Sequence, residues 1–322
     1  MIANDVHGKN HHVRGTFGNH VRSFGLLRAS AETVCSFNEN RQLYAATIGG
    51  LGLTGVITWA EIQLMAIRSN RIDSMAVRFG DLAEFFALSN ELDRRHEYAV
   101  AWIDCVAKGR AAGRGAYIVG DHAADGVLEL GRRAKLSVPL TPRFSPINRL
   151  TLRAFNAAYW RMHPARRTPQ RVGYEPFFFP LDRILNWNRL YGRNGFQQYQ
   201  CVIPEASADG AMHELLAATA DAGMGSCLAV LKRCGDIASP GLLSFPLPGT
   251  SLALDFPQSA QLERSLFPRL DSIVRAAGGR LYPAKDAHMS GADFRKAYPA
   301  WEKIEALRDP SLNSRFWKRV TG

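Results

Sequence analysis

The amino-acid sequence predicts an α+β fold, in which helices pack against a mainly antiparallel sheet. Helix-like and strand-like segments follow one another without the regular strand–helix alternation of a doubly wound sheet. The common nucleotide-binding loops GxGxxG and GxxxxGK[ST] are both absent from the sequence. The chain has 322 residues, of which 46% are hydrophobic and 21% charged. This length allows one large domain or two ordinary domains with real cores, and it excludes a disordered tail protein.

The first half of the chain is predicted to begin irregularly and then to form a helix and two strands. Residues 1–28 are rich in Gly, His and Asn, which indicates a loop with short extended pieces. Residues 43–69 begin as a glycine-broken apolar loop and continue as β structure. Asp81 is placed to cap a helix whose apolar side carries Leu82, Phe85, Phe86 and Leu92. Buried strands are expected at 97–107 and 115–122.

The second half is predicted to supply further strands and the longest helices. Residues 197–204 alternate as a strand should, and an amphipathic helix at 213–223 ends at Gly223. We expect further strands at 226–235 and 250–257. A long helix is expected at 259–277 with a kink at Pro268, and two short helices near the C-terminus are separated by Pro299.

Positive charge is concentrated in one block of the sequence. The chain carries 40 Lys and Arg against 29 Asp and Glu, a net charge of +11. Residues 132–171 hold ten Lys or Arg, five prolines and no acidic residue. This block is interpreted either as a solvated loop or as a landing surface for a phosphate or an anionic lipid. Aromatic side chains lie inside the block, but no nucleic-acid motif accompanies them, so nucleic acid is not expected as a partner.

Cysteine usage and hydropathy indicate where the protein functions. Five cysteines without CxxC spacing favour reduced thiols, and they predict neither a zinc site nor a disulfide framework. No stretch reaches the roughly 18 apolar residues of a membrane-spanning helix. The first residues, MIANDVHGKNHH, lack the apolar region of a signal peptide. We therefore expect a cytoplasmic protein that contacts a membrane at most peripherally, and no metal.

Several segments carry side chains suited to chemistry. The opening DVHGKNHH is interpreted as a metal site, as a structural loop, or as a loop lying against a cofactor, with the third interpretation favoured. Residues 49–55, GGLGLTG, suit either a tight turn or a flat aromatic ligand. Lys232 is a lone cation in an apolar strand. Gln198 and Gln200 share one strand face because side chains alternate across a strand.

Together these segments resemble one family. DVHGKNHH, GTFGNHV, ATIGGLGLTGVI, AWIDC, GFQQYQCVIP and GGRLYPAKD occur in the order found in decaprenylphosphoryl-β-D-ribose oxidases and their relatives. Those proteins are flavoproteins of the vanillyl-alcohol oxidase, or p-cresol methylhydroxylase (PCMH), type. The resemblance covers essentially the whole chain. It implies non-covalently bound FAD and an FAD-binding domain of the PCMH type joined to a substrate domain with a mainly antiparallel sheet.

The resemblance also implies roles for particular residues. The cofactor-binding set that it implies is Asn4, Asp5, Val6, His7, Ile57 and Tyr282. The substrate-pocket set that it implies is Lys9, Trp102, Gln198, Gln200 and Lys232. Lys285 matches a lysine beside the flavin, and Lys285 and His7 are the expected catalytic residues. A cation near the flavin stabilises negative charge on the reduced ring. The proton relay is left open between His7 and Lys285.

Two departures from the family pattern stand out. Ala253 occupies the position of a family cysteine that nitroaromatic inhibitors capture covalently, so such capture is not expected here. The family also carries a long stretch before the histidine motif, with the loop that holds the FAD pyrophosphate. We therefore expect this chain to lack the N-terminal part of the FAD domain. Residues 1–69 would be its remainder, 70–279 the substrate domain with the basic loop block 132–171, and 280–322 a C-terminal segment that returns to the FAD domain.

The activity implied is the oxidation of a secondary alcohol on a sugar by hydride transfer to flavin. The expected substrate is a phosphorylated or lipid-linked sugar, a polyprenylphosphoryl pentose that serves as a cell-wall polysaccharide precursor. A short-chain reductase acting on the keto product is an expected partner. Two alternatives stay open: an aldonolactone or alditol oxidase of the same superfamily, and a truncated fragment that binds an anionic partner without turnover. The segment Leu-Tyr-Pro-Ala-Lys counts against the first alternative, whose members carry His-Trp-x-Lys.

Overall fold

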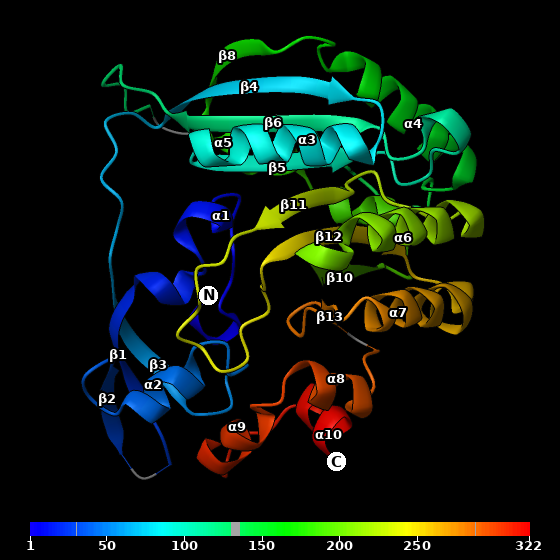
Figure 1. Ribbon diagram of the computed structural model, residues 1–322. Coiled ribbons are helices and arrows are strands. Elements are labelled where there is room, and N and C mark those ends of the chain that lie inside the picture. The colour runs from blue at the N-terminus through cyan, green and yellow to red at the C-terminus, as the bar shows by residue number, and fades with distance from the viewer. Residues whose placement is uncertain (30, 130–135, 287) are drawn as a thin grey trace.

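Two sheets organise the chain, and the polypeptide passes from one to the other between Ile62 and Arg71 (Figure 1). The computed structural model describes residues 1–29, 31–129, 136–286 and 288–322. The smaller sheet has the order β2–β1–β3, is antiparallel and packs with α2. The elements of this N-terminal unit are α1 (His11–Arg14), β1 (Val21–Leu27), β2 (Glu32–Ser36), α2 (Arg41–Thr47) and β3 (Val56–Ile62).

The larger sheet has eight strands among the described residues, in the order β13–β10–β12–β11–β5–β6–β4–β8. Every neighbouring pair in it is antiparallel. Its strands are β4 (Arg71–Phe79), β5 (Tyr98–Ile103), β6 (Gly115–His122), β8 (Thr168–Gly173), β10 (Phe196–Pro204), β11 (Val230–Cys234), β12 (Gly249–Pro257) and β13 (Arg280–Leu281). A further two-stranded ladder joins β7 (Leu136–Ser137) to β9 (Ile184–Leu185).

Three helices cover one face of the large sheet: α3 (Leu82–Leu92), α6 (Ala208–Ala222) and α7 (Phe267–Ala276) (Figure 1). Their apolar sides pack with alternate strand residues such as Leu252, Leu254 and Phe256, all fully buried. The predicted cap is confirmed, because the Asp81 side chain accepts from the Glu84 N–H. The predicted end at Gly223 is also confirmed, in the left-handed conformation that glycine adopts most easily. This face forms the main core.

The basic block contains regular structure, so its description as a loop is wrong. α4 (Arg149–Met162) lies within it, and the side chain of Asn148 caps the helix by accepting from two backbone N–H groups. Leu152 and Asn156, four residues apart, form the buried side of α4. β8 adds an edge strand beside β4. Residues 132, 133 and 135 of the block lie outside the described residues.

Two other sequence predictions are corrected in detail. The start of segment 43–69 is helical, because α2 runs to Thr47 before the glycines begin. The long helix predicted over 259–277 consists of a wide π turn at Leu262–Leu266 followed by α7. Pro268 is the second residue of α7 and directly follows the π turn. Short helices also form at α5 (Tyr174–Phe178), α8 (Gly291–Ala297), α9 (Trp301–Leu307) and α10 (Arg315–Thr321).

The C-terminal residues contact both parts of the chain. β13 pairs with β10 at one edge of the large sheet. Further on, the Asp309 carboxylate accepts from the Ala29 N–H at 2.8 Å, and the Asp309 N–H donates to the Leu53 carbonyl at 2.9 Å. The end of the chain is thereby tied to the N-terminal unit. The domain boundaries and the PCMH-type assignment stay predictions.

Candidate functional site

The opposite face of the large sheet carries polar side chains that alternate with the core residues of the same strands. One cross-strand row runs from Gln200 through Ala253 and Val230 to Trp102, as the strand register shows. Two of the predicted pocket residues stand at the ends of this row. Ala253, where the family has cysteine, stands inside it. We call this surface the polar face. Its members on β10, β12, β11 and β5 are Gln198, Gln200, Val202, Val230, Lys232, Cys234, Ser251, Ala253, Asp255, Tyr98, Val100 and Trp102.

The N-terminal motif lies against this face. The Ala99 N–H of β5 donates to the Lys9 carbonyl at 2.9 Å, next to the point where β5 and β11 stop pairing. The Lys232 ammonium donates to the Gly8 carbonyl at 2.7 Å and to Nδ1 of His7. Three segments far apart in sequence therefore meet around one imidazole.

His7 is held from both sides. Its Nδ1 accepts from Lys232, and its Nε2 lies 3.1 Å from the Gln200 side-chain amide. Burial and the neighbouring Lys232 hold the pKa of His7 well below its usual value. The ring is therefore neutral near pH 7, and its one acceptor nitrogen is occupied by an ammonium. Lys232 is 7% exposed, and burial lowers its pKa as well.

Tyr282 and Lys285 approach His7 from the C-terminal side. The Tyr282 ring centroid is 5.6 Å from that of His7, and Phe245 stacks on Tyr282 at 4.5 Å. The Tyr282 hydroxyl donates to the Asn4 carbonyl at 3.1 Å. Lys285 is exposed and near enough to help lower the pKa of His7. His7, Asn4, Tyr282 and Lys285 thus share one neighbourhood.

Two predicted pocket residues make contacts further along the polar face. The Lys9 ammonium donates to the Phe177 carbonyl and lies 4.7 Å from the centroid of the same ring, and burial lowers the pKa of Lys9 to about 8. Trp102 is covered by Tyr159 of α4, at 4.8 Å between ring centroids, and donates to the Cys227 carbonyl. Lys9 and Trp102 therefore border the Lys232–His7 pair without touching it in the described contacts.

Asp5 has a structural role that the sequence did not reveal. Its fully buried carboxylate accepts from the Gly18 N–H at 2.7 Å and from the hydroxyls of Ser239 and Ser244. The carboxylate is thus committed to fastening the N-terminal segment to the loop before β12. The backbone of Val6 accepts from the Phe17 N–H at 2.8 Å. A cofactor bound at Asp5 and Val6 would therefore contact their backbone groups and not the Asp5 side chain.

The glycine-rich loop and Ile57 belong to the N-terminal unit. The Gly49 and Leu51 N–H groups donate to the Ile2 and Ala3 carbonyls at 3.0 and 2.7 Å, so the loop lies against the first residues. Gly52 has φ +77° and open space where a side chain would stand. Ile57 pairs with Leu26 and packs on the small core of this unit. The described contacts do not join Ile57 to His7.

Sequence reasoning missed Asp255 and Ser251, and it named His11 only as part of the opening motif DVHGKNHH. The first two lie on the polar face, and the alternation Ser-Leu-Ala-Leu-Asp in β12 could have revealed them. His11 is 1% exposed, and its Nδ1 accepts from the Gly235 N–H at 3.1 Å. Its Nε2 has no hydrogen-bond partner among the described residues, and the ring lies 6.2 Å from that of His7.

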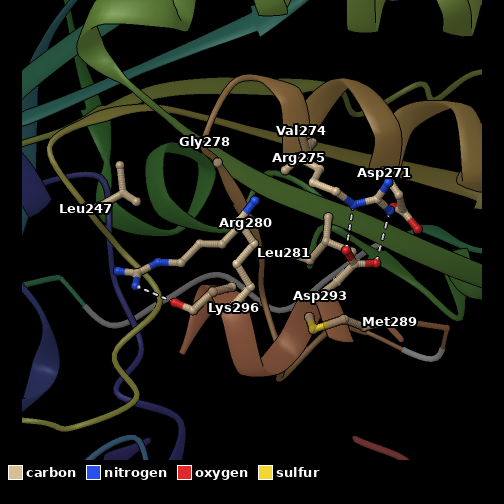
Figure 2. Close-up of a pocket in the computed structure, with 12 residues that line it drawn as sticks. Leu247, Asp271, Val274, Arg275, Gly278, Arg280, Leu281, Met289, Asp293 and Lys296 are labelled. Carbon is tan, nitrogen blue, oxygen red and sulfur yellow. Dashed lines mark hydrogen bonds and ion pairs between the residues drawn. The ribbon is translucent and has the colours of Figure 1, made fainter. Parts of the chain in front are cut away.

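A cavity of about 170 Å³ lies away from this site, between α7, β13 and α8 (Figure 2). Figure 2 shows Arg275 and Asp293 pointing toward each other as an ion pair, and Arg280 reaching toward the chain near Lys296. None of the predicted site residues lines this cavity. In the described part of the chain, no group of His, Cys, Asp or Glu is placed to hold a metal ion. The helices described there are all too short or too polar to cross a bilayer.

Comparison with known proteins places the chain in a family. No family model matches it. It is 34% identical over 328 residues to an uncharacterized protein in the mprA 5′ region of Streptomyces coelicolor, spanning 96% of this chain and 88% of that protein. It is 32% identical over 324 residues to decaprenylphosphoryl-beta-D-ribose oxidase of Mycolicibacterium smegmatis, spanning 96% of this chain and 70% of that enzyme.

The chain is therefore related to an oxidoreductase over nearly its whole length. It belongs to the family of decaprenylphosphoryl-beta-D-ribose oxidase, which confirms the resemblance drawn from its motifs. The expectation that part of the FAD domain is missing stays a prediction.

Proposed function

We propose that this protein is an FAD-dependent oxidoreductase that oxidises a secondary alcohol of a sugar, with a polyprenylphosphoryl pentose as its substrate. One observation carries the proposal: His7, Lys232 and Gln200, from three distant segments, meet on the polar face. Buried polar groups normally satisfy one another or serve a ligand, and this cluster borders half-exposed Ala253 and Val230.

The residues present fit a flavin. His11 Nε2 is a buried polar atom with no hydrogen-bond partner among the described residues. Lys285 has no ion pair among the described residues, so its ammonium is available to an anionic ring. Backbone groups of residues 4–7 and the Tyr282 side chain would hold the cofactor. When bound, FAD would accept a hydride from the alcohol carbon.

The chain's own residues would supply position and electrostatic field. Lys232 fixes His7 in the neutral form, and Gln200 fixes the orientation of the imidazole. Lys285 adds positive charge near the same point and would stabilise negative charge that develops during the transfer. Gln198, Gln200 and the buried Ser251 would offer hydrogen bonds to sugar hydroxyls.

The phosphate and lipid of the substrate suit the arginine-rich surface at and before α4. Arg143, Arg149 and Arg153 are exposed and form no ion pair with described residues, while Arg167 and Arg171 pair with carboxylates. Leu140 and Phe144 are 77% and 79% exposed next to them. We propose that this surface makes peripheral contact with an anionic membrane, where each arginine contributes about 1 kcal/mol. The keto product would be passed to a short-chain reductase.

The test is anaerobic reduction of the FAD-loaded protein, which is measured as the loss of flavin absorbance. A short-chain polyprenylphosphoryl pentose in anionic vesicles should reduce the flavin faster than the same compound in neutral vesicles, and free aldonolactones and alditols should not reduce it. Lys285→Ala should slow reduction at least 100-fold without unfolding the chain, and Lys303→Ala, an exposed lysine on α9, is the matched control.

Two outcomes would contradict the proposal. Reduction by an aldonolactone alone would favour the alternative oxidase class. Failure of the purified chain to retain FAD would favour a fragment without turnover.

A further inference from the structure

Asp255 is a buried carboxyl group on the polar face that the proposed function has not yet used. Its side chain is 4% exposed. Oδ1 accepts from the side-chain amide of Gln198, its partner across the strands, at 2.8 Å. Among the described residues, Asp255 forms no ion pair, and Oδ2 has no hydrogen-bond partner. A buried carboxyl with one unused oxygen faces the site where the substrate is proposed to bind.

The groups around Asp255 leave it able to gain or lose a proton near neutral pH. Burial raises its pKa from 3.8 to about 6, against the lowering effects of the Gln198 hydrogen bond and the positive charge of Lys285. Tyr191 and Cys227 also face it, and both have raised pKa values. These two groups are therefore neutral at pH 7, and Lys285 is the charged neighbour.

The other two candidates for the proton acceptor are unsuited to that task. The acceptor nitrogen of His7 is occupied by the Lys232 ammonium, so accepting a proton would place two cations in contact. The proposed function gives Lys285 the role of a cation that stabilises developing negative charge, and an ammonium group carries no lone pair with which to accept a proton. A general base needs both a free lone pair and a pKa near the working pH.

We propose that Asp255 accepts the hydroxyl proton of the alcohol substrate. This inference rests on the proposed function, since it assigns the proton acceptor of that same reaction. The carbon–hydrogen bond of the alcohol breaks, and its electron pair leaves with the hydrogen as hydride to the flavin. The oxygen–hydrogen bond breaks, and the proton passes to Asp255 Oδ2 as the carbonyl double bond forms. Water takes the proton when the ketone leaves.

The test compares Asp255→Asn with Gln198→Ala in anaerobic stopped-flow reduction of the FAD-loaded protein between pH 5 and pH 9. The substrate is a short-chain polyprenylphosphoryl pentose. The wild-type rate should rise with pH through an ionisation near 6. Asp255→Asn should be at least 100-fold slower and lack that ionisation. Gln198→Ala keeps the carboxyl but removes a hydrogen bond that lowers its pKa, so the ionisation should move to higher pH.

A second readout needs neither cofactor nor turnover. Infrared difference spectra of the unliganded protein between pH 5 and pH 8 should show a protonated carboxyl band that Asp255→Asn lacks. If this band is present and the wild type oxidises no such substrate, the proposed function fails, and the proton role fails with it. If the wild type is active and Asp255→Asn keeps both its rate and its pH profile, the proposed function survives and this inference is wrong.

Discussion

The two faces of the eight-stranded sheet are built from the same strands but differ in what covers them. Leu252 and Leu254 of β12 point toward α6 and α7 and are fully buried, whereas Ser251, Ala253 and Asp255 lie on the polar face. Helices cover the first face, and the second meets the N-terminal motif and α4. Because side chains alternate along one strand, its residues contribute in turn to the stability of the core and to the proposed site. Substitutions one residue apart should therefore have different kinds of effect.

The largest effect is expected on the helix-covered face. Leu252→Ala leaves a cavity in the main core and should lower the free energy of unfolding by about 2–5 kcal/mol. Leu150→Ala is the matched control, because Leu150 of α4 is 77% exposed, and its truncation should change stability by less than about 0.5 kcal/mol. Urea denaturation measures both. Equal losses in the two variants would show that α6 and α7 do not form the core described here.

A pH-dependent effect is expected on the polar face. The pKa of Asp255 is about 6 in the folded protein against 3.8 ordinarily, so the folded state binds the proton more tightly than the unfolded state. Stability is therefore lost as pH rises from about 4 to about 6, and the full penalty is present above that window. Asp255→Asn removes it, so the stability gain of the variant should be greater at pH 8 than at pH 4 by about 2 kcal/mol. A gain that is independent of pH would contradict the burial of an ionisable group there.

The smallest effect on stability is expected for Ala253→Cys, whose main effect should be a new reactive thiol. Ala253 is half-buried on the polar face, whereas the native cysteines are buried except for the half-buried Cys227. The variant should show one additional thiol that reacts rapidly with a maleimide in the native protein. Leu254→Cys, one residue along on the helix-covered face, should react only after unfolding. If both thiols were equally protected from the maleimide, the polar face would be inaccessible to small molecules, which would contradict a binding site there.

Local patterns predicted those elements whose causes lie close together in sequence. The Asp81 cap, the Gly223 end and the strands at 115–122 and 250–257 follow from capping chemistry and alternation. The block 132–171 was misjudged because its charge and prolines outweighed the pattern of Leu152 and Asn156. Leu152 and Asn156 form a buried helix side only when α4 packs against the rest of the fold. Gln200 and Lys232 could be named from the family motifs, but their meeting with His7 could not.

By itself, the sequence determined the family and the alternation that places Gln198, Gln200 and Lys232 on particular strand faces. These properties depend on motif order and on the two-residue period of a strand, which are local. Only the tertiary structure decided that Lys232 occupies the acceptor nitrogen of His7, that the Asp5 carboxylate fastens the N-terminal segment, and that the buried Asp255 has no ion-pair partner in the part of the chain that the structure describes. Hydrogen-bond partners and desolvation depend on which distant segments pack together, and no single segment carries that information.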